Sequence, residues 1–204
     1  MAARGRFIVL EGGEGSGKST QAARLTAALD AVQTREPGGT AVGAQLREVL
    51  LGRDTTGLSD RAEALLMAAD RAQHVAEVVE PALAAGRHVV CDRFLGSSVA
   101  YQGYGRGLDP AEVRDLSVWA TAGLLPDLVV LLTVPAEESV RRTGGARDRI
   151  EDAGVDFHQR VADGFAAQAA ADPDRWVVVD GTGTKDEVTA AVLAAVTDRL
   201  GLDL

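Results

Sequence analysis

The chain has 204 residues, 46% of them hydrophobic and 25% charged, a balance typical of a soluble globular domain and not of a disordered chain. The net charge of −9 argues against a protein that binds nucleic acid through general attraction to phosphate, and 4% aromatic residues leave few side chains for base stacking. The longest apolar runs, such as Leu128–Val134, are far shorter than the roughly 20 residues needed to cross a bilayer. We therefore expect neither a nucleic-acid nor a membrane partner.

The cysteine content bears on the cellular compartment, and the lack of internal boundaries bears on the number of domains. Cys91 is the only cysteine, so no internal disulfide can form, and no signal-peptide pattern precedes the first apolar run. Neither a repeat of 20 to 50 residues nor a Pro/Ser/Gly linker divides the sequence. We expect one domain over residues 1–204 in the cytoplasm.

Short apolar segments rich in β-branched residues predict the strands. Four are clear and one, at 31–34, is weaker; in chain order they are 7–10, 31–34, 88–91, 128–134 and 176–179. They lack polar alternation, which is typical of strands covered on both faces. Segments with helical spacing lie between them, so we expect right-handed crossovers, a parallel sheet and an α/β fold.

The helical segments carry apolar stripes that predict which face is buried. In the first helix Leu25 and Leu29 share a face. In the second the stripe is Val42, Leu46, Val49 and Leu50, and in the third it is Leu65, Ala69, Ala72, Ala76 and Val79. Later helices are expected at 112–122, 157–171 and 185–200.

The third helix also has a second pattern. Met67, Arg71 and His74 fall together on a face different from the predicted core stripe. Pro81 should end or kink this helix, because proline has no N–H to donate.

The first strand is followed by a phosphate-binding motif. Residues 12–19 read Gly-Gly-Glu-Gly-Ser-Gly-Lys-Ser, which matches G-x-x-x-x-G-K-[ST] between a buried strand and a helix. In such a loop the backbone N–H groups and the helix N-terminus surround phosphate oxygens. Lys18 would reach the β- and γ-phosphates, and the Ser19 hydroxyl would bind Mg²⁺. The expected ligand residues are Gly12, Gly13, Gly15, Ser16, Gly17, Lys18, Ser19 and Thr20.

The motif predicts that the chain binds a nucleoside triphosphate, but it does not say which reaction the nucleotide undergoes. The chain lacks the guanine-binding N-K-x-D of regulatory GTPases, because Thr184 and not Asn precedes Lys185. An ATPase motor would be expected to be larger. A small phosphate-transfer enzyme fits better.

A second charged site follows the strand at 88–91. Asp92 stands at its carboxyl end, where a second group that organises Mg²⁺ would lie, and Arg93 offers a planar fork for another phosphate. Downstream, residues 97–103 (Ser-Ser-Val-Ala-Tyr-Gln-Gly) form a polar and aromatic cluster suited to a sugar or base. Ser97, Ser98, Tyr101 and Gln102 are its candidate ligand residues.

Four segments in order resemble the thymidylate kinase family, which phosphorylates dTMP with ATP. They are 11–20, 34–40 (Thr-Arg-Glu-Pro-Gly-Gly-Thr), 92–103 and 148–151 (Asp-Arg-Ile-Glu). The resemblance spans essentially the whole chain. It implies a three-layer α/β/α P-loop kinase with a parallel sheet of about five strands, with ATP as co-substrate, Mg²⁺, and a homodimeric state.

The resemblance also implies roles for the acceptor side. Arg93, with Arg35 and Arg47, would bind the dTMP phosphate, and Arg71 would contact thymine. Ser98 and Tyr101 would line the sugar, and Glu14 would contact a sugar hydroxyl. Taken alone, Arg47 would be a solvated surface residue, and an ion pair with Asp70 or Glu77 is the alternative interpretation of Arg71.

Met67 departs from the family pattern. Where the family usually has a phenylalanine stacked on thymine, methionine keeps apolar contact without ring stacking. This leaves a different acceptor, such as dUMP, as an alternative. A nucleotide-binding switch that transfers no phosphate is a second alternative.

The arginine-rich segment 141–149 predicts a lid over ATP, spanning about 141–152. Four arginines fall within nine residues, and arginine there would stabilise the charge of the migrating phosphoryl group. Family members carry this catalytic residue either in the phosphate loop or in the lid, and Gly13, Glu14 and Ser16 exclude the first type here. Arg147 or Arg142 is expected to act, while Arg149 pairs with Glu151 or Asp148. Residues 180–183 (Asp-Gly-Thr-Gly) resemble the loop that packs on adenine.

Overall fold

Five parallel strands form the sheet of the computed structural model, which describes residues 3–143 and 149–202. In chain order they are β1 (Phe7–Glu11), β2 (Val32–Arg35), β3 (Val89–Asp92), β4 (Leu128–Thr133) and β5 (Trp176–Asp180). Their order in the sheet is β2-β3-β1-β4-β5. Every predicted strand is present within one residue at each end, and the α/β fold is confirmed.

Helices connect and flank these strands. The helices are α1 (Lys18–Leu29), α2 (Ala41–Leu51), α3 (Asp60–His74), α4 (Glu80–Ala84), α5 (Leu95–Ser98), α6 (Pro110–Ala120), α7 (Ala136–Thr143), α8 (Val155–Ala171) and α9 (Lys185–Leu200). Two π-helical segments, η1 (Val75–Val79) and η2 (Val99–Gly105), and a 3₁₀ turn, η3 (Glu151–Ala153), complete the chain.

Each face of the sheet has its own hydrophobic core, which gives three layers. On one face, strand residues such as Ile8, Leu10 and Val130 pack against α1 and α9. On the other face, Phe7 and Val9 belong to a cluster built from η1, η2 and α8. Alternate strand residues thus enter opposite cores, which explains the absence of polar alternation.

The buried face of α3 is not the predicted one. Val79, the last residue of the expected apolar stripe, is completely buried in the core, but Leu65 is 57% exposed and Ala69 and Ala76 are exposed as well, so most of the stripe does not face the core. The buried residues of α3 are Glu63, Ala64, Ala68, Asp70, Arg71 and His74. The prediction for these positions was wrong because the inward face of α3 is largely polar, and hydrogen bonds hold Glu63, Arg71 and His74 there, which an apolar pattern cannot reveal.

The stripe of α2 is wrong in the same way at two positions. Val42 and Val49 are exposed, whereas Leu50 is buried. Pro81 was expected to end or kink the third helix. Helical backbone continues past Pro81 to Ala84, so the proline does not end it, but the regular α-helix gives way to the π-helical segment η1 just before the proline.

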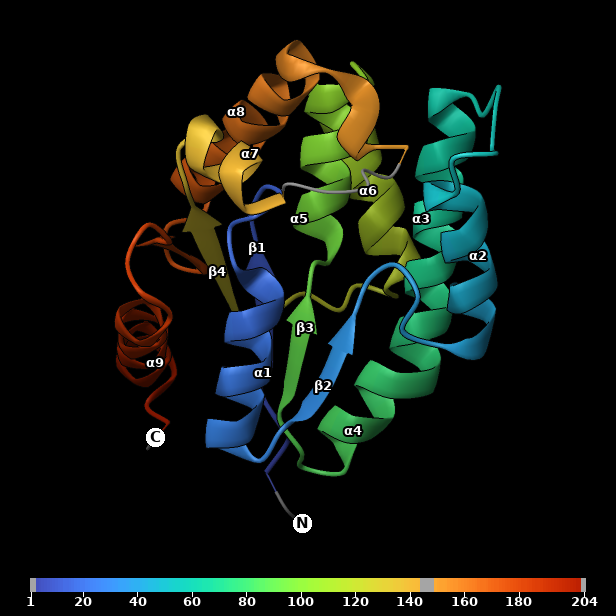
Figure 1. Cartoon of the computed structure of the whole chain (residues 1–204). Coiled ribbons are helices and arrows are strands. Elements are labelled where there is room, and N and C mark those ends of the chain that lie inside the picture. The colour runs from blue at the N-terminus through green and yellow to red at the C-terminus, as the bar shows by residue number, and fades with distance from the viewer. Residues whose placement is uncertain (1–2, 144–148, 203–204) are drawn as a thin grey trace.

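The order of the strands determines where a ligand can bind. The chain after β1 turns to β2 and β3 on one side of the sheet, whereas β4 and β5 lie on the other side of β1. Such a switch opens a crevice at the carboxyl ends of the strands. In Figure 1 the arrows of β2, β3 and β4 point to this end, and α7 lies beyond it.

Candidate active site

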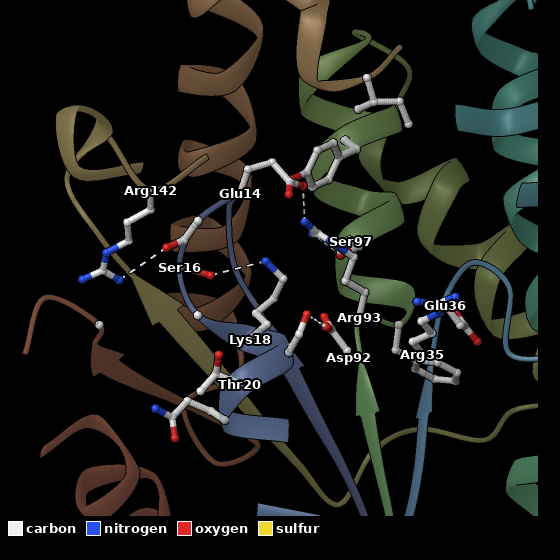
Figure 2. A pocket seen from close by; sticks show the side chains of 18 of the residues that line it. Glu14, Ser16, Lys18, Thr20, Arg35, Glu36, Asp92, Arg93, Ser97 and Arg142 are labelled. Atoms are coloured by element: carbon white, nitrogen blue, oxygen red, sulfur yellow. Dashed lines mark hydrogen bonds and ion pairs between the residues drawn. The ribbon is translucent and has the colours of Figure 1, made fainter. Parts of the chain in front are cut away.

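A cavity of about 870 Å³ lies at the carboxyl ends of β1, β2 and β3. Most of the predicted site residues line it: Glu14, Gly15, Ser16, Gly17, Lys18, Ser19, Thr20, Arg35, Arg47, Met67, Arg71, Asp92, Arg93, Ser97, Ser98, Tyr101, Gln102 and Arg142. Gly12 and Gly13 do not line it, and Arg147 lies outside the described residues. Figure 2 shows the side chains around this cavity.

The phosphate loop, residues 12–19, joins β1 to α1 through glycines in unusual backbone conformations. Gly12 has a φ of 141°, and a Cβ atom there would come within 2.3 Å of the Leu132 carbonyl oxygen. Gly17 has a φ of 95° and precedes α1, whose N-terminus has no side-chain cap. The first N–H groups of α1 therefore carry the partial positive charge that favours an anion.

Lys18 lies within this loop and is almost completely buried. Its Nζ donates to the Gly13 carbonyl at 2.6 Å and lies 3.3 Å from Ser16 Oγ (Figure 2). Burial, together with the nearby charge of Arg93, lowers the Lys18 pKa to about 8. Its ammonium group is thus poorly solvated and would gain from an anionic partner.

The Ser19 hydroxyl and Asp92 meet between the phosphate loop and β3. Ser19 Oγ donates to Asp92 Oδ2 at 2.5 Å. Asp92 Oδ1 is buried and has no hydrogen-bond partner among the described residues. A hydroxyl beside an unsatisfied carboxylate oxygen matches the hard oxygen ligands that Mg²⁺ prefers.

Arg93 is held in place beside the phosphate loop by several contacts. It has a φ of 70°, in the left-handed region that non-glycine residues seldom adopt. Its guanidinium pairs with Glu14, donates to the Gly12 carbonyl at 3.0 Å and lies over the Tyr101 ring (Figure 2). The guanidinium fork is therefore oriented before any ligand arrives.

Buried Glu11, at the end of β1, stabilises the loop that carries Arg93. Its Oε1 accepts from the backbone N–H groups of Phe94 and Ser97, at 3.0 and 2.9 Å. Its Oε2 accepts from Ser97 Oγ at 2.6 Å. Burial raises the Glu11 pKa, while the hydrogen bond from Ser97 and the charge of Arg93 oppose this rise. The sequence analysis did not identify Glu11 as a site residue.

Arg71 is buried, and its ion-pair partner is neither Asp70 nor Glu77. Its Nε donates to Glu36 Oε2 at 2.8 Å, and its terminal nitrogens donate to Ser117 Oγ at 3.1 Å and Ser98 Oγ at 3.0 Å. The alternative of an ion pair with a sequence neighbour is not what the structure shows, because Glu36 reaches Arg71 from the loop after β2. Arg71 therefore lines the cavity in a fixed orientation.

A second set of hydrogen bonds, through His74, holds Glu36 in place. His74 is completely buried, with Nδ1 2.8 Å from Glu36 Oε1 and Nε2 2.6 Å from Thr34 Oγ1. Asp70 Oδ1 accepts from Gly38 N at 3.0 Å, so the same helix also holds the loop after β2. Glu36 lies in the segment 34–40 that carries the family resemblance, so a carboxylate next to Arg35 was the available signal.

Two of the predicted phosphate-binding arginines stand beside this loop. Arg35 ends β2 with an exposed side chain, and Arg47 on α2 donates to the Pro37 carbonyl at 2.8 Å. Met67 is half-buried and packs against the core cluster of this face. These residues share the cavity with Arg93 but come from three different elements.

The arginines of the predicted lid lie on both sides of the undescribed residues 144–148. Arg141 and Arg142 are in the helix α7, where each pairs with Glu138. Arg142 Nη1 also approaches the Gly15 carbonyl at 3.3 Å. Figure 2 shows Arg142 directed to the phosphate loop.

Arg149 contacts the ends of two helices. Its Nη2 contacts Glu63 Oε2 at 2.5 Å, and its Nε donates to the Leu50 carbonyl at 3.0 Å. Its expected partners, Asp148 and the Glu151 side chain, lie outside what the structure describes, so that pairing stays a prediction.

Among the described residues, no group of three or more His, Cys, Asp or Glu side chains is placed to hold a metal ion. No helix in that part of the chain is long and apolar enough to cross a membrane. Cys91 is buried in β3, where its thiol donates to the Arg93 carbonyl, as expected of a structural residue.

Comparisons with known proteins agree with this geometry. The family model described as thymidylate kinase matches residues 10–192. The thymidylate kinase of Solidesulfovibrio magneticus is 50% identical over 93% of this chain and 98% of that protein, and that of Clavibacter sepedonicus is 53% identical over 94% and 93%. The crystal structure of thymidylate kinase from Ehrlichia chaffeensis superposes with a TM-score of 0.80 at 30% identity, covering 95% of this chain and 99% of that one. The chain belongs to the thymidylate kinase family.

Proposed function

We propose that this member of the thymidylate kinase family transfers the γ-phosphate of ATP to dTMP, giving dTDP and ADP. The observation that carries the proposal is that one cavity is lined both by the phosphate loop and by Arg93, Arg35 and Arg47. Two groups of anion-binding residues in one cavity suit a donor phosphate and an acceptor phosphate. A nucleotide switch would have no use for the second site.

The donor triphosphate would lie on the phosphate loop. Lys18 would leave the Gly13 carbonyl for the β- and γ-phosphates, and the N-terminus of α1 would add further positive charge. Residues 181–183 line the cavity beside this loop, which supports their assignment to adenine. The acceptor phosphate is already ionised at neutral pH, so alignment and charge neutralisation suffice for transfer.

The acceptor nucleotide would lie between Arg93 and α3. Arg93, Arg35 and Arg47 would bind its phosphate, and Glu14 would exchange its contact with Arg93 for a sugar hydroxyl. Ser97, Ser98 and Tyr101 would line the sugar. Arg71 presents N–H donors that suit a thymine carbonyl, Gln102 would contact the base, and Met67 supplies apolar contact.

Mg²⁺ would be held by Ser19 and Asp92 together with phosphate oxygens. The unpartnered Asp92 Oδ1 and the adjacent Ser19 hydroxyl suit this ion, which needs few protein ligands when phosphates supply the rest. When bound, Mg²⁺ supplies charge neutralisation between the β- and γ-phosphates. The protein's own part is to orient these two oxygens.

A lid arginine would stabilise charge on the migrating phosphoryl group. Arg142 already lies near Gly15 and lines the cavity, and Arg147 is the other candidate. An arginine in this role is worth roughly 10³ to 10⁵ in rate. Closure of the lid, at about 141–152, would also exclude water and limit ATP hydrolysis.

The acceptor is tested by measuring ADP formation with dTMP, dUMP, CMP and AMP at equal concentration. We expect dTMP to be phosphorylated faster than CMP and AMP, because the carbonyl oxygens of its base complement the donors of Arg71. Equal rates with dTMP, CMP and AMP would defeat the assignment, and a preference for dUMP would assign the acceptor to uracil. Single-turnover transfer of labelled γ-phosphate would separate an enzyme from a binding protein.

The active species is proposed to be a cytoplasmic homodimer. Trp119 on α6 is 80% exposed and Leu65 on α3 is 57% exposed, and α3 packs beside both α2 and α6. Apolar side chains gathered on adjoining helices support a subunit contact. The single, buried Cys91 fits a reducing compartment. Sedimentation should give twice the 21.2 kDa chain mass.

A further inference from the structure

Gln102, in η2, has a buried side-chain amide in which, among the residues that the structure describes, the nitrogen is hydrogen-bonded but the oxygen is not. The residue is 1% exposed and lines the cavity. Its Nε2 donates to Glu63 Oε1 at 2.9 Å, whereas its Oε1 is buried without a hydrogen-bond partner among the described residues. A buried oxygen without a hydrogen bond is energetically unfavourable, so a ligand that donates to it would be favoured.

Glu63 is equally buried and is surrounded by donors. Arg106 contacts it through Nε at 3.2 Å and Nη2 at 3.1 Å, and Arg149 contacts it at 2.5 Å. Burial by itself would raise the Glu63 pKa, but the hydrogen bonds from Arg106, Gln102 and Arg149 lower it. An ionised carboxylate has no proton to donate, so it can be matched only by the NH₂ side of the Gln102 amide.

We propose that Glu63 is a specificity-determining positioning residue, which holds the Gln102 amide with its carbonyl oxygen turned to the base of the acceptor nucleotide. The inference rests on the proposed function, because it takes that base to be thymine. Thymine N3–H is a donor and would satisfy Gln102 Oε1. Cytosine N3 is an acceptor, so its lone pair would be repelled by the lone pair of Gln102 Oε1. The opposite amide orientation would reverse this preference.

A comparison with Arg71 shows why Gln102 needs such a neighbour. A guanidinium presents only N–H donors whichever way it turns, so its chemistry toward the base is always the same. An amide has two orientations of nearly identical shape and opposite hydrogen-bonding character. Only an acceptor-only neighbour such as Glu63 decides between them.

The direct test is Glu63→Gln, which keeps the size of the side chain but places a group opposite Gln102 that can donate as well as accept. We expect the ratio of kcat/KM for dTMP to that for dCMP to fall at least about tenfold, mainly through a higher KM for dTMP. Arg106→Met is the matched control. It removes an ionic partner of Glu63 but leaves the acceptor in place, so it should lower Tm and keep the ratio.

A double-mutant cycle separates positioning from simple support of the fold. Gln102→Met removes the amide and should lower the same ratio, and adding Glu63→Gln to it should lower the ratio no further. An unchanged ratio in Glu63→Gln would overturn the inference but not the proposed function. The same holds if Glu63→Gln lowers the ratio equally in the unaltered chain and in Gln102→Met. Lack of dTMP preference in the unaltered chain would overturn the proposed function and this inference with it.

A measurement on the unaltered chain covers the case in which Glu63→Gln does not fold. The side-chain NH₂ of Gln102 should exchange with solvent at least about 100-fold more slowly than that of Gln159, because its bond to Glu63 is buried. Gln159 makes the same kind of bond, to Asp163 at 3.0 Å, on the surface. Equal exchange rates, followed by NMR, would contradict the proposed orientation.

Discussion

The two sides of the cavity are built in different ways. The phosphates of the donor would lie on eight consecutive residues, 12–19, whose backbone and helix N-terminus supply positive potential. The acceptor side gathers side chains from β2, α2, α3, the loop after β3, α5 and η2. The phosphate loop is local in sequence, whereas the acceptor side exists only after folding.

The difference also lies in what orients the polar groups. On the donor side, glycine conformations determine where the N–H groups point. On the acceptor side, buried carboxylates do this work: Glu11 holds the loop of Arg93, Glu36 holds Arg71, and Glu63 holds Gln102. A side-chain site therefore needs a supporting shell that a backbone site does not.

Arg93→Ala gives the largest expected effect and tests whether the two sides are separable. We expect kcat for dTMP to fall by at least about 10³-fold, because the acceptor phosphate loses its oriented guanidinium, while the Kd for ATP stays within about threefold. Steady-state kinetics and calorimetry would measure the two. Arg175→Ala, at a surface pair with Asp172, is the control and should change neither. Loss of ATP affinity in Arg93→Ala would show that the sides are not separate.

Asp92→Asn tests the proposed Mg²⁺ site, where the phosphate loop meets the end of β3. The amide keeps the shape but loses the charge beside Ser19, so kcat should fall by about 10²-fold and the Mg²⁺ concentration for half-maximal rate should rise. A Mg²⁺ titration of the initial rate would measure both. An unchanged Mg²⁺ dependence would remove Asp92 from the metal site.

The Lys18 pKa of about 8 predicts pH-dependent binding on the donor side. Only protonated Lys18 attracts phosphate, so the Kd for ATP should rise about tenfold between pH 7 and pH 9. The lowered pKa also means that the unfolded chain holds this proton to higher pH, so the stability of the free protein should gain from rising pH above about 8. Calorimetry across this range measures the affinity. Lys18→Arg, charged throughout, should bind ATP with no such slope.

Met67→Phe gives the smallest expected effect and tests the apolar contact with the base on the acceptor side. An aromatic ring on thymine is worth about 0.5–1.5 kcal/mol beyond area burial, so the KM for dTMP should fall about fivefold. ATP affinity should not change, because Met67 lies on α3 away from the phosphate loop. A higher KM for dTMP would show that the half-buried site cannot accept the ring.

The strands and the phosphate loop could be predicted from the sequence because their signals are local. A continuous apolar run has few alternatives to a buried strand, and the loop needs glycine and lysine at fixed spacing. Asp92 and Arg93 follow a strand directly, so their place at the edge of the sheet also follows from the sequence. The family resemblance extended this to Arg35, Arg47 and Arg71.

The inward face of α3 and the partners of the arginines were decided only by the tertiary structure. Apolar periodicity predicted Leu65 as core, yet the buried side carries Glu63 and Arg71, because polar groups can be buried wherever distant partners satisfy them. Glu36 and Arg149 meet partners 35 and 86 residues away. Nothing local encodes such pairs, so the sequence by itself determined the sheet, the phosphate loop and the family, and folding decided which carboxylate orients which side chain.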